Sequence, residues 1–237
     1  PFFIEKPIHI SLTSARKVAE EVDKQSLITA VGYHWRAQKR TQRAAKFLRD
    51  RTPSLVQGWW YGGMPGVWWW RRKAESGGQH MEQTTHIYDL ARYLAGDVEK
   101  VYAVGGTGAM NDVADYDVED VSTAVLEFTN GAIGTIVSGC ISDGTGKPTV
   151  GLRVDGRGWT VDMVQGGRLS ISKPGKGIEM EDDSDPFLLE DRAFINAIKK
   201  GDGSKIYCSY PDGMKSLAVT LAVDKAIKTG KTQKVQA

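Results

Sequence analysis

"DVSTAVLEFTNGAIGTIVSGCIS", residues 120–142, carries alternating apolar side chains on both sides of Asn130-Gly131. An alternation with a period of two is the pattern of a half-buried strand, and Asn-Gly between two such runs favours a tight hairpin turn. Strand-like runs also occupy residues 98–106 and 149–172, where Asp155-Gly156 is a second candidate turn. The middle of the chain therefore predicts an antiparallel or mixed sheet.

The first 35 residues predict a different unit, in which a helix over 11–24, with Ser11 as its N-cap, connects short strands at 2–4 and 27–33. Such a βαβ unit keeps its strands parallel, and ligands lie at the carboxyl ends of parallel strands. The first strand ends at Glu5-Lys6-Pro7, where the proline stiffens the turn that aims Lys6. The alternative is a lysine in a solvated loop. Because the chain begins inside a strand and without methionine, we expect a fragment whose preceding part is absent.

Composition narrows the class of protein. The 237 residues carry a net charge of +2, their basic side chains are scattered, and no apolar run approaches the roughly 18 residues that a membrane span requires. We therefore expect no nucleic-acid partner and no membrane segment. The only cysteines, Cys140 and Cys208, are far apart in the sequence, so neither a disulfide framework nor a zinc knuckle is indicated. A cytoplasmic location is the default.

"SGGQHMEQTTHIYDLARYL", residues 76–94, concentrates titratable side chains in a predicted helix. Glu82, His86 and Asp89 share one stripe because they are spaced i, i+4 and i+7. Metal-binding helices place two histidines four residues apart, whereas His80 and His86 are six apart, so we expect no metal. The spacing suits a carboxylate that orients the His86 imidazole for acid/base work. A surface Glu/His pair without chemistry is the alternative.

Two further segments have competing interpretations. Tryptophans at 59, 60 and 68–70 can stack on a sugar, although such clusters more often belong to a core or a subunit interface. "GTGKPT", residues 144–149, resembles a phosphate loop but lacks its first glycine and its final hydroxyl residue. We find no G-x-G-x-x-G motif and expect no phosphate loop in these 237 residues. Helices are also predicted at 37–51, 186–200 and 213–229.

Three segments resemble the glucose-fructose oxidoreductase/inositol dehydrogenase (Gfo/Idh/MocA) family. They are "IEKPIHISLTSARKVAEEVDKQSLITAVGYHWR" from residue 4, "WRRKAESGGQHMEQTTHIYDLARYLAGDVEKVYAVGG" from residue 70 and "FLLEDRAFINAIKKGD" from residue 187. The resemblance implies an α+β fold, a large open mostly antiparallel or mixed sheet with helices on one face. It also implies that residues 1–35 are the C-terminal remnant of a dinucleotide-binding Rossmann domain. Residues 36–237 would be the substrate-binding and oligomerisation domain.

The resemblance also implies roles for individual residues. Lys6 matches the lysine of the family's E-K-P motif, so Glu5, Lys6 and Pro7 are expected near the cofactor. His86 matches the histidine of the D-x-G-x-H-x-x-D pattern, the usual proton acceptor, and Asp89 matches its last aspartate. The chain departs from this pattern in having Glu82 for the first aspartate and Thr84 for the glycine. We predict Lys6, Glu82 and His86 as catalytic, and the substrate-binding side chains as Asp89, Tyr33, Arg36 and Trp70.

The sequence thus predicts the substrate-binding part of an NAD(P)-dependent oxidoreductase that acts on a sugar, polyol or related hydroxy compound. NAD or NADP would bind mainly through the absent N-terminal segment, so the fragment alone is expected to be inactive. Because an open sheet leaves one face uncovered, we expect a homodimer or homotetramer through residues 98–172. The competing interpretations are a non-catalytic sugar-binding or scaffold relative and a metal hydrolase that uses His80, Glu82 and His86.

Overall fold

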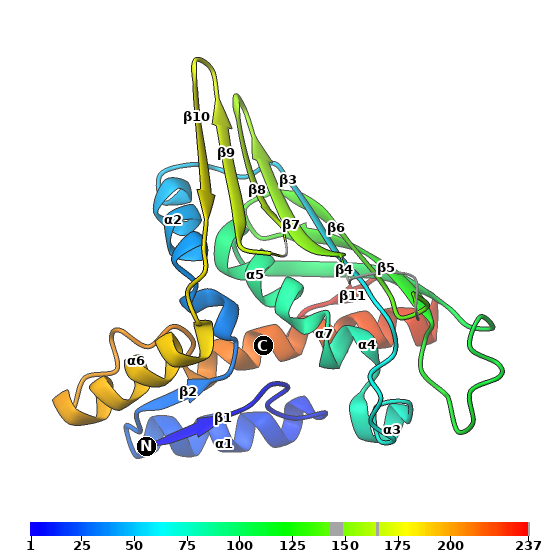
Figure 1. Ribbon diagram of the computed structural model, residues 1–237. Helices are drawn as coiled ribbons and strands as arrows, with labels where there is room; N and C mark the ends of the chain where they lie inside the picture. The colour runs from blue at the N-terminus through cyan, green and yellow to red at the C-terminus, as the bar shows by residue number, and fades with distance from the viewer. Residues whose placement is uncertain (143–148, 165, 237) are drawn as a thin grey trace.

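The computed structural model describes residues 1–142, 149–164 and 166–236. Within these residues the strands form two sheets, a parallel pair of strands near the N-terminus and a nine-stranded mixed sheet (Figure 1). The "GTGKPT" segment, apart from Thr149, lies outside the described residues. None of the helices in the described part of the chain has the length and apolar character needed to cross a membrane.

The N-terminal unit is the predicted strand, helix and strand. β1 (Phe2–Ile4) lies parallel to β2 (Thr29–Val31), and α1 (Leu12–Lys24) connects them. Ser11 begins the helix, as expected, because its side chain accepts a hydrogen bond from the Ser14 N–H. The buried face of α1 carries Ala15, Ala19 and Val22, and these pack in one core with Val31, Tyr33 and Leu217. The βαβ unit is therefore joined to the C-terminal helix by a shared core.

The large sheet has the strand order β10-β9-β8-β7-β3-β6-β5-β4-β11. In chain order its strands are β3 (Leu55–Tyr61), β4 (Val98–Gly106), β5 (Val121–Phe128), β6 (Ile133–Gly139), β7 (Thr149–Gly156), β8 (Trp159–Val164), β9 (Arg168–Lys173), β10 (Lys176–Glu181) and β11 (Gln233–Lys234). Among these described strands only β3 and β6 pair in parallel, so the sheet is mixed but mostly antiparallel, as predicted.

The two predicted hairpins are both present, but one turn lies elsewhere. Asn130 and Gly131 connect β5 to β6, and Gly131 adopts a φ of 85°, which the tight turn requires. In the second hairpin Gly156 still pairs with Trp159, so the turn is Arg157-Gly158 and not Asp155-Gly156. Gly158 supplies the positive φ of 79° in this turn.

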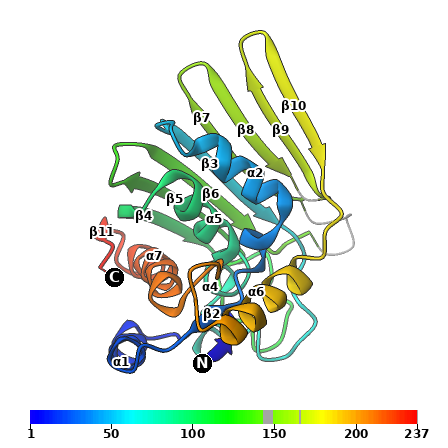
Figure 2. The same ribbon diagram turned by 90° about the vertical axis from the view of Figure 1, so that its left-hand side faces the viewer.

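The helices cover one face of the large sheet (Figure 2). α2 (Lys39–Leu48), α5 (Thr85–Ala95) and α7 (Tyr210–Thr229) contribute to the same buried core as the inward residues of the strands. On the opposite face large apolar side chains remain exposed, namely Tyr61, Tyr102, Val104, Val121 and Val125. α6 (Pro186–Lys200) packs against the 3₁₀ helix η1 (His34–Ala37) below the sheet. The predicted α+β fold with helices on one face is confirmed.

The predicted helix over residues 76–94 is interrupted. α3 (Lys73–Ser76) ends at Gly77, α4 (Gln79–Glu82) is a single turn, and α5 begins only at Thr85. Gly77 and Gly78 have φ values of 76° and 89°, so the chain cannot continue as a helix through them. A second break lies at Gln83 and Thr84, so the i, i+4 relation of Glu82 and His86 spans two helices and the single stripe expected from periodicity is not formed.

Candidate active site

Lys6 and Glu82 meet where the N-terminal unit joins the large domain. The Lys6 Nζ donates to the Glu82 Oε1 at 2.8 Å and to the Glu82 backbone oxygen at 2.7 Å. The other carboxylate oxygen of Glu82 accepts a hydrogen bond from the Trp70 Nε1 at 3.0 Å. Both charged side chains are largely buried, with exposed fractions of 14% and 18%. The site therefore holds one ammonium and one carboxylate in a fixed pair.

His86 begins the first turn of α5 and is enclosed by aromatic side chains. The rings of Trp35 and Trp60 lie nearly parallel to the His86 ring, with centroids at 5.5 and 6.2 Å. The rings of Tyr33 and His34 meet it edge-on, at 5.9 and 4.7 Å. Only 5% of His86 is exposed. The imidazole thus lies in an aromatic enclosure, which we call the His86 box and define by Tyr33, His34, Trp35 and Trp60.

The surroundings keep His86 uncharged at neutral pH. Burial is the largest influence and, with Lys6 and His34, it lowers the pKa of His86 well below its ordinary value of 6.5. The His86 Nδ1 is buried and has no hydrogen-bond partner among the described residues. A neutral imidazole with a free nitrogen can accept a proton from a hydroxyl group that reaches it.

A buried network fixes the elements that carry this box. Arg36 on η1 donates from Nε and Nη2 to both carboxylate oxygens of Asp89 on α5, each at 2.7 Å. The Ser216 hydroxyl of α7 donates to the Asp89 Oδ1 at 2.6 Å, and Arg36 also pairs with Asp212. The Tyr33 hydroxyl lies 3.0 Å from the Thr85 hydroxyl. Three helical segments are therefore held together directly beneath His34 and His86.

The structure brings some predicted site residues together and buries others. Lys6 and Trp70 both form hydrogen bonds with Glu82. Glu82 does not bond to His86, because the chain turns between α4 and α5. The residues predicted to bind substrate are at most 2% exposed, namely Tyr33, Arg36, Trp70 and Asp89. Their contacts are within the protein, so the geometry gives them a positioning role. Thr84 is fully buried and lines no accessible surface.

Glu5 and Pro7 flank Lys6 in the turn that follows β1. The carboxylate of Glu5 lies against Gly32, where a Cβ atom would come within 2.7 Å of its Oε2. A side chain at position 32 would therefore displace Glu5. The turn places Glu5 and Lys6 at the carboxyl end of β1, which is the position that ligands occupy beside parallel strands.

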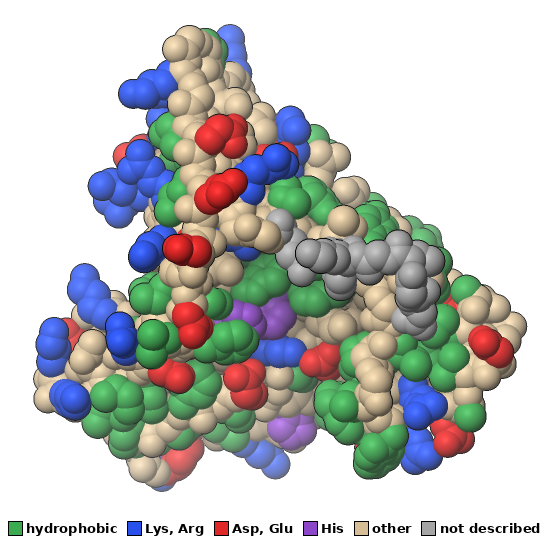
Figure 3. Space-filling model, in the orientation of Figure 1, with side chains coloured by type: hydrophobic (Ala, Val, Ile, Leu, Met, Phe, Trp, Pro, Cys, Tyr) green, Lys and Arg blue, Asp and Glu red, His purple; other side chains and the backbone are tan. Residues whose placement is uncertain are grey.

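Sequence reasoning named Tyr33 of the His86 box but missed its other aromatic members. His34, Trp35 and Trp60 were not predicted as site residues, and neither was Phe187 of α6, which stacks on His34 with centroids at 4.1 Å. The available signal was the run Tyr33-His34-Trp35 directly after a parallel strand. Figure 3 shows histidine side chains near the centre of one face, bordered by hydrophobic side chains, with basic and acidic side chains below them.

A second buried histidine lies outside this site. His80 on α4 is fully buried and is surrounded by charged side chains, with the Asp224 Oδ1 at 3.9 Å from its Nε2. Lys73 binds both Glu119 and Asp224, and Lys228 binds Asp224 at 2.8 Å. We call these five side chains the His80 cluster. Within the described ranges no group of three or more His, Cys, Asp or Glu side chains is placed to hold a metal ion.

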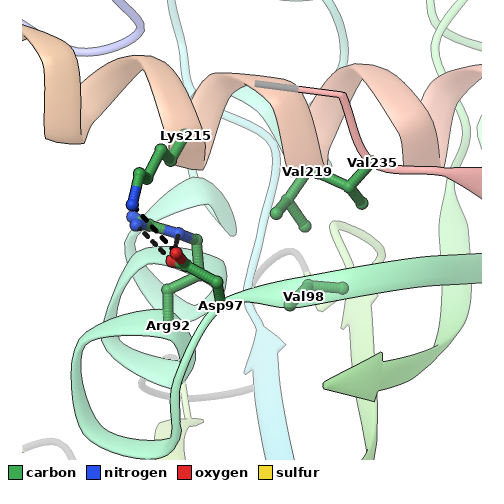
Figure 4. A pocket seen from close by; sticks show the side chains of 6 residues that line it. All are labelled: Arg92, Asp97, Val98, Lys215, Val219 and Val235. Carbon is green, nitrogen blue, oxygen red and sulfur yellow. Dashed lines mark hydrogen bonds and ion pairs between the residues drawn. The ribbon is translucent and has the colours of Figure 1, made fainter. Parts of the chain in front are cut away.

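The pocket in Figure 4 is also separate from the candidate site. It lies between the end of α5, the start of β4 and α7, and its volume is about 180 Å³. Asp97 bridges Arg92 at 2.8 Å and Lys215 at 2.9 Å on one side, while Val98, Val219 and Val235 form the other. Its charged groups are already paired with one another, so the pocket offers a ligand no free charge.

In this fold a parallel βαβ unit and an open mixed sheet meet near Lys6 and His86. Residues 45–158 match the model of the GFO/IDH/MocA C-terminal domain. The resemblance recognised from the sequence is thereby confirmed over this region.

Individual relatives agree with this assignment. An uncharacterized protein of Schizosaccharomyces pombe is 28% identical over 92% of this chain, and the chain spans 64% of that protein's length. The myo-inositol 2-dehydrogenase of Thermotoga maritima is 24% identical over 99% of this chain and 72% of its own length. The structure of a levoglucosan dehydrogenase in complex with NADH and levoglucosan superposes with a TM-score of 0.87 at 17% identity, covering 98% of this chain and 73% of that one.

Proposed function

We propose that this chain is the substrate-binding part of an NAD(P)-dependent oxidoreductase that acts on a sugar, a polyol or a related hydroxy compound. The observation that carries the proposal is the meeting of a fixed lysine–carboxylate pair and an uncharged histidine at the carboxyl end of a parallel strand. Relatives named as inositol and levoglucosan dehydrogenases support the substrate class.

Several residues of this chain would have separate roles in the oxidation. His86 would accept the proton of the substrate hydroxyl, because its ring is neutral and its Nδ1 has no partner among the described residues. Lys6 would polarise the reacting oxygen with its ammonium group. Glu82 would hold Lys6 in place by the 2.8 Å ion pair, and Trp70 would hold Glu82. Asp89, Tyr33 and Arg36 would position α5 and η1 around the substrate.

The chain's own residues fit the reactive end of a nicotinamide cofactor. Glu5, Lys6 and Pro7 follow a parallel strand, and Glu5 lies directly on Gly32 of the neighbouring strand's end. When bound, NAD or NADP would supply the hydride acceptor. We infer that its phosphates are bound by residues outside this chain, because residues 1–237 contain no glycine-rich phosphate loop.

The test is His86→Asn in the full-length protein, assayed with NAD and NADP on a panel of sugars and polyols. We expect turnover to fall by about 10² to 10⁴, the range for loss of a general base, while dinucleotide affinity is retained. The exposed His9→Gln serves as the matched control. Undiminished turnover would remove His86 from the mechanism. A wild-type protein that binds sugars without turning them over would instead support the non-catalytic alternative.

We also propose that two or four copies of the chain associate through the uncovered face of the large sheet. Tyr102 and Val125 lie opposite each other there, and Tyr61, Val104 and Val121 extend the apolar surface. Val125→Asp should lower the molar mass measured by light scattering. The matched variant Lys225→Asp changes a surface charge on α7 and should leave the mass unchanged. A monomeric wild-type protein would contradict the proposal.

A further inference from the structure

His34 is the one histidine whose ring contacts the His86 ring. The centroids of the two rings are 4.7 Å apart and their planes are inclined at 65°. On its other side the His34 ring stacks on Phe187 at 4.1 Å, with an interplanar angle of 26°. His34 is therefore held between a residue of α6 and the proposed proton acceptor, in an orientation fixed by two ring contacts.

Both rings have an unused nitrogen. The Nδ1 atoms of His34 and His86 are buried, and neither has a hydrogen-bond partner within the described part of the chain. Buried polar atoms are nearly always paired, so an unpaired atom on each of two touching rings indicates a group that completes the site when it is in use. A substrate hydroxyl or a water molecule that reaches these nitrogens would meet that requirement.

The carboxylates near the pair are engaged elsewhere. Glu82 binds Lys6 and Trp70, and Asp89 binds Arg36 and Ser216. A histidine that acts as a base is usually oriented by a carboxylate, but here the His86 ring faces a second imidazole. His34 is only half-buried, whereas His86 is 95% buried, so a proton on His34 exchanges with solvent more easily than a proton on His86.

We propose that His34 is a positioning and proton-relay residue that acts through His86. The proton that His86 takes from the substrate hydroxyl moves to His34 and then to solvent, while the hydride goes to the nicotinamide dinucleotide of the proposed reaction. One proton and one hydride leave the alcohol, which becomes a carbonyl compound. The inference rests on the proposed role of His86.

The electrostatic surroundings keep both imidazoles uncharged at neutral pH. Burial and the nearby Lys6 lower the pKa of His34 to about 4, against a hydrogen bond with the Gly32 backbone that raises it. The elements packed against η1 contribute other charged groups, but Asp89 of α5 is paired with Arg36 and Arg40 of α2 bonds to backbone oxygens. On α6, burial and Glu5 raise the pKa of Glu190 to about 8, so this carboxyl is largely uncharged at pH 7. A proton on either imidazole is therefore released readily.

The first experiment is steady-state kinetics of His34→Gln and His34→Ala in the full-length protein. His34→Gln keeps a polar group but cannot carry a proton, and we expect kcat to fall about tenfold to a hundredfold with KM changed less than about twofold. Added imidazole should raise the kcat of His34→Ala at least about fivefold, because a free base replaces the missing ring. His86→Asn and the control His9→Gln should show no such rescue. Loss of activity in His34→Ala without imidazole rescue would assign His34 a purely structural role.

The second experiment needs no turnover. Ring resonances of His86 are followed by NMR as a function of pH in the wild type and in His34→Gln. Because His34 lowers the pKa of His86, the variant should show a raised His86 pKa. An unchanged His86 titration would overturn the coupling of the two rings. If the wild type shows no dehydrogenase activity but the titrations are coupled, the proposed function fails and the histidine pair stands.

Discussion

Two buried histidines, His80 and His86, lie six residues apart in the sequence, and the side chains that surround them differ in charge. His86 is enclosed by aromatic rings, and the charges near it are limited to the Lys6–Glu82 pair. His80 lies among Lys73, Glu119, Asp224 and Lys228. Burial is the first cause of the lowered pKa in both, so the same physical effect operates in the proposed substrate site and in the His80 cluster.

The two regions differ in their access to solvent and in the ion pairing of their charged side chains. The His86 box is bordered by Phe187, which is 54% exposed, whereas the His80 ring is 0% exposed. Around His80 each charged side chain has an opposite charge within ion-pair distance, so removing one member leaves a partner unpaired. Desolvation and a buried ring nitrogen without a partner are common to both histidines, so neither identifies a functional histidine, and access through partly exposed neighbours is the more informative feature.

The largest effect is expected at the pair that holds the His86 box together. Asp89→Asn removes the carboxylate that accepts two hydrogen bonds from the Arg36 guanidinium, which is 2% exposed, and leaves Arg36 with Asp212 alone. Breaking such a buried pair costs about 3 to 5 kcal/mol, which urea unfolding can measure. The control Glu127→Gln breaks the exposed Lys100–Glu127 pair and should cost less than about 1 kcal/mol. Equal losses in the two variants would show that Asp89 does not stabilise the box.

The next effect concerns the pH dependence of stability at His80. Burial lowers the pKa of His80 to about 4, whereas an unfolded histidine has a pKa near 6.5. The unfolded chain therefore binds the proton first, and stability falls as the pH drops from about 6.5 to about 4, by about 3 kcal/mol in all. His80→Gln should make the free energy of unfolding flatter in this window, and His9→Gln should behave as the wild type does. A His80→Gln protein as acid-sensitive as the wild type would contradict this.

Local sequence patterns predicted the fold where short-range chemistry decides the structure. The Asn130-Gly131 turn, the Ser11 cap and the helix over Pro186–Lys200 depend on neighbouring residues and were predicted correctly. The helix predicted over residues 76–94 with a glycine-rich entry was wrong beyond that entry, because it is interrupted between α4 and α5. Its breaks are stabilised by contacts from far along the chain, such as Lys6 bonding to the Glu82 backbone oxygen.

The candidate site could be predicted only in part for the same reason. Lys6 and His86 were recognised through motifs, but 76 residues separate Lys6 from its partner Glu82, so their contact could not be read from spacing. Trp60 stands on β3 and His34 on η1, and only the packing of these elements on α5 brings both rings to His86. Residue type does not tell whether an aromatic side chain belongs to the core or to the site, whereas contacts of this kind do.

A smaller effect is expected at the hydrogen bond that Trp70 donates to Glu82, the carboxylate paired with Lys6. Trp70→Phe keeps an aromatic ring but removes the Nε1–H that donates to the Glu82 Oε2 at 3.0 Å. Hydrogen bonds to charged groups contribute about 1.5 to 3 kcal/mol, so we expect thermal unfolding to show a loss of about 2 kcal/mol. Trp69→Phe, at a half-exposed neighbour, is the control and should be nearly neutral. A neutral Trp70→Phe would mean that Lys6 alone fixes Glu82.

The smallest effect tests the difference in access directly. Diethyl pyrocarbonate labels neutral imidazoles that solvent can reach, and mass spectrometry reports the rate at each histidine. We expect His34 to be labelled in the folded protein and His80 only after unfolding, because the His80 ring is fully buried. Phe187→Ala removes the ring that stacks on His34, a contact of about 0.5 to 1.5 kcal/mol, and should raise the labelling rate of His34 by a factor of about 2 to 10. The variant should leave His80 unlabelled, since α6 is not among its neighbours in the His80 cluster. If His80 were labelled as fast as His34, the two regions would not differ in access, and the opening beside His34 would lose its value as a sign of function.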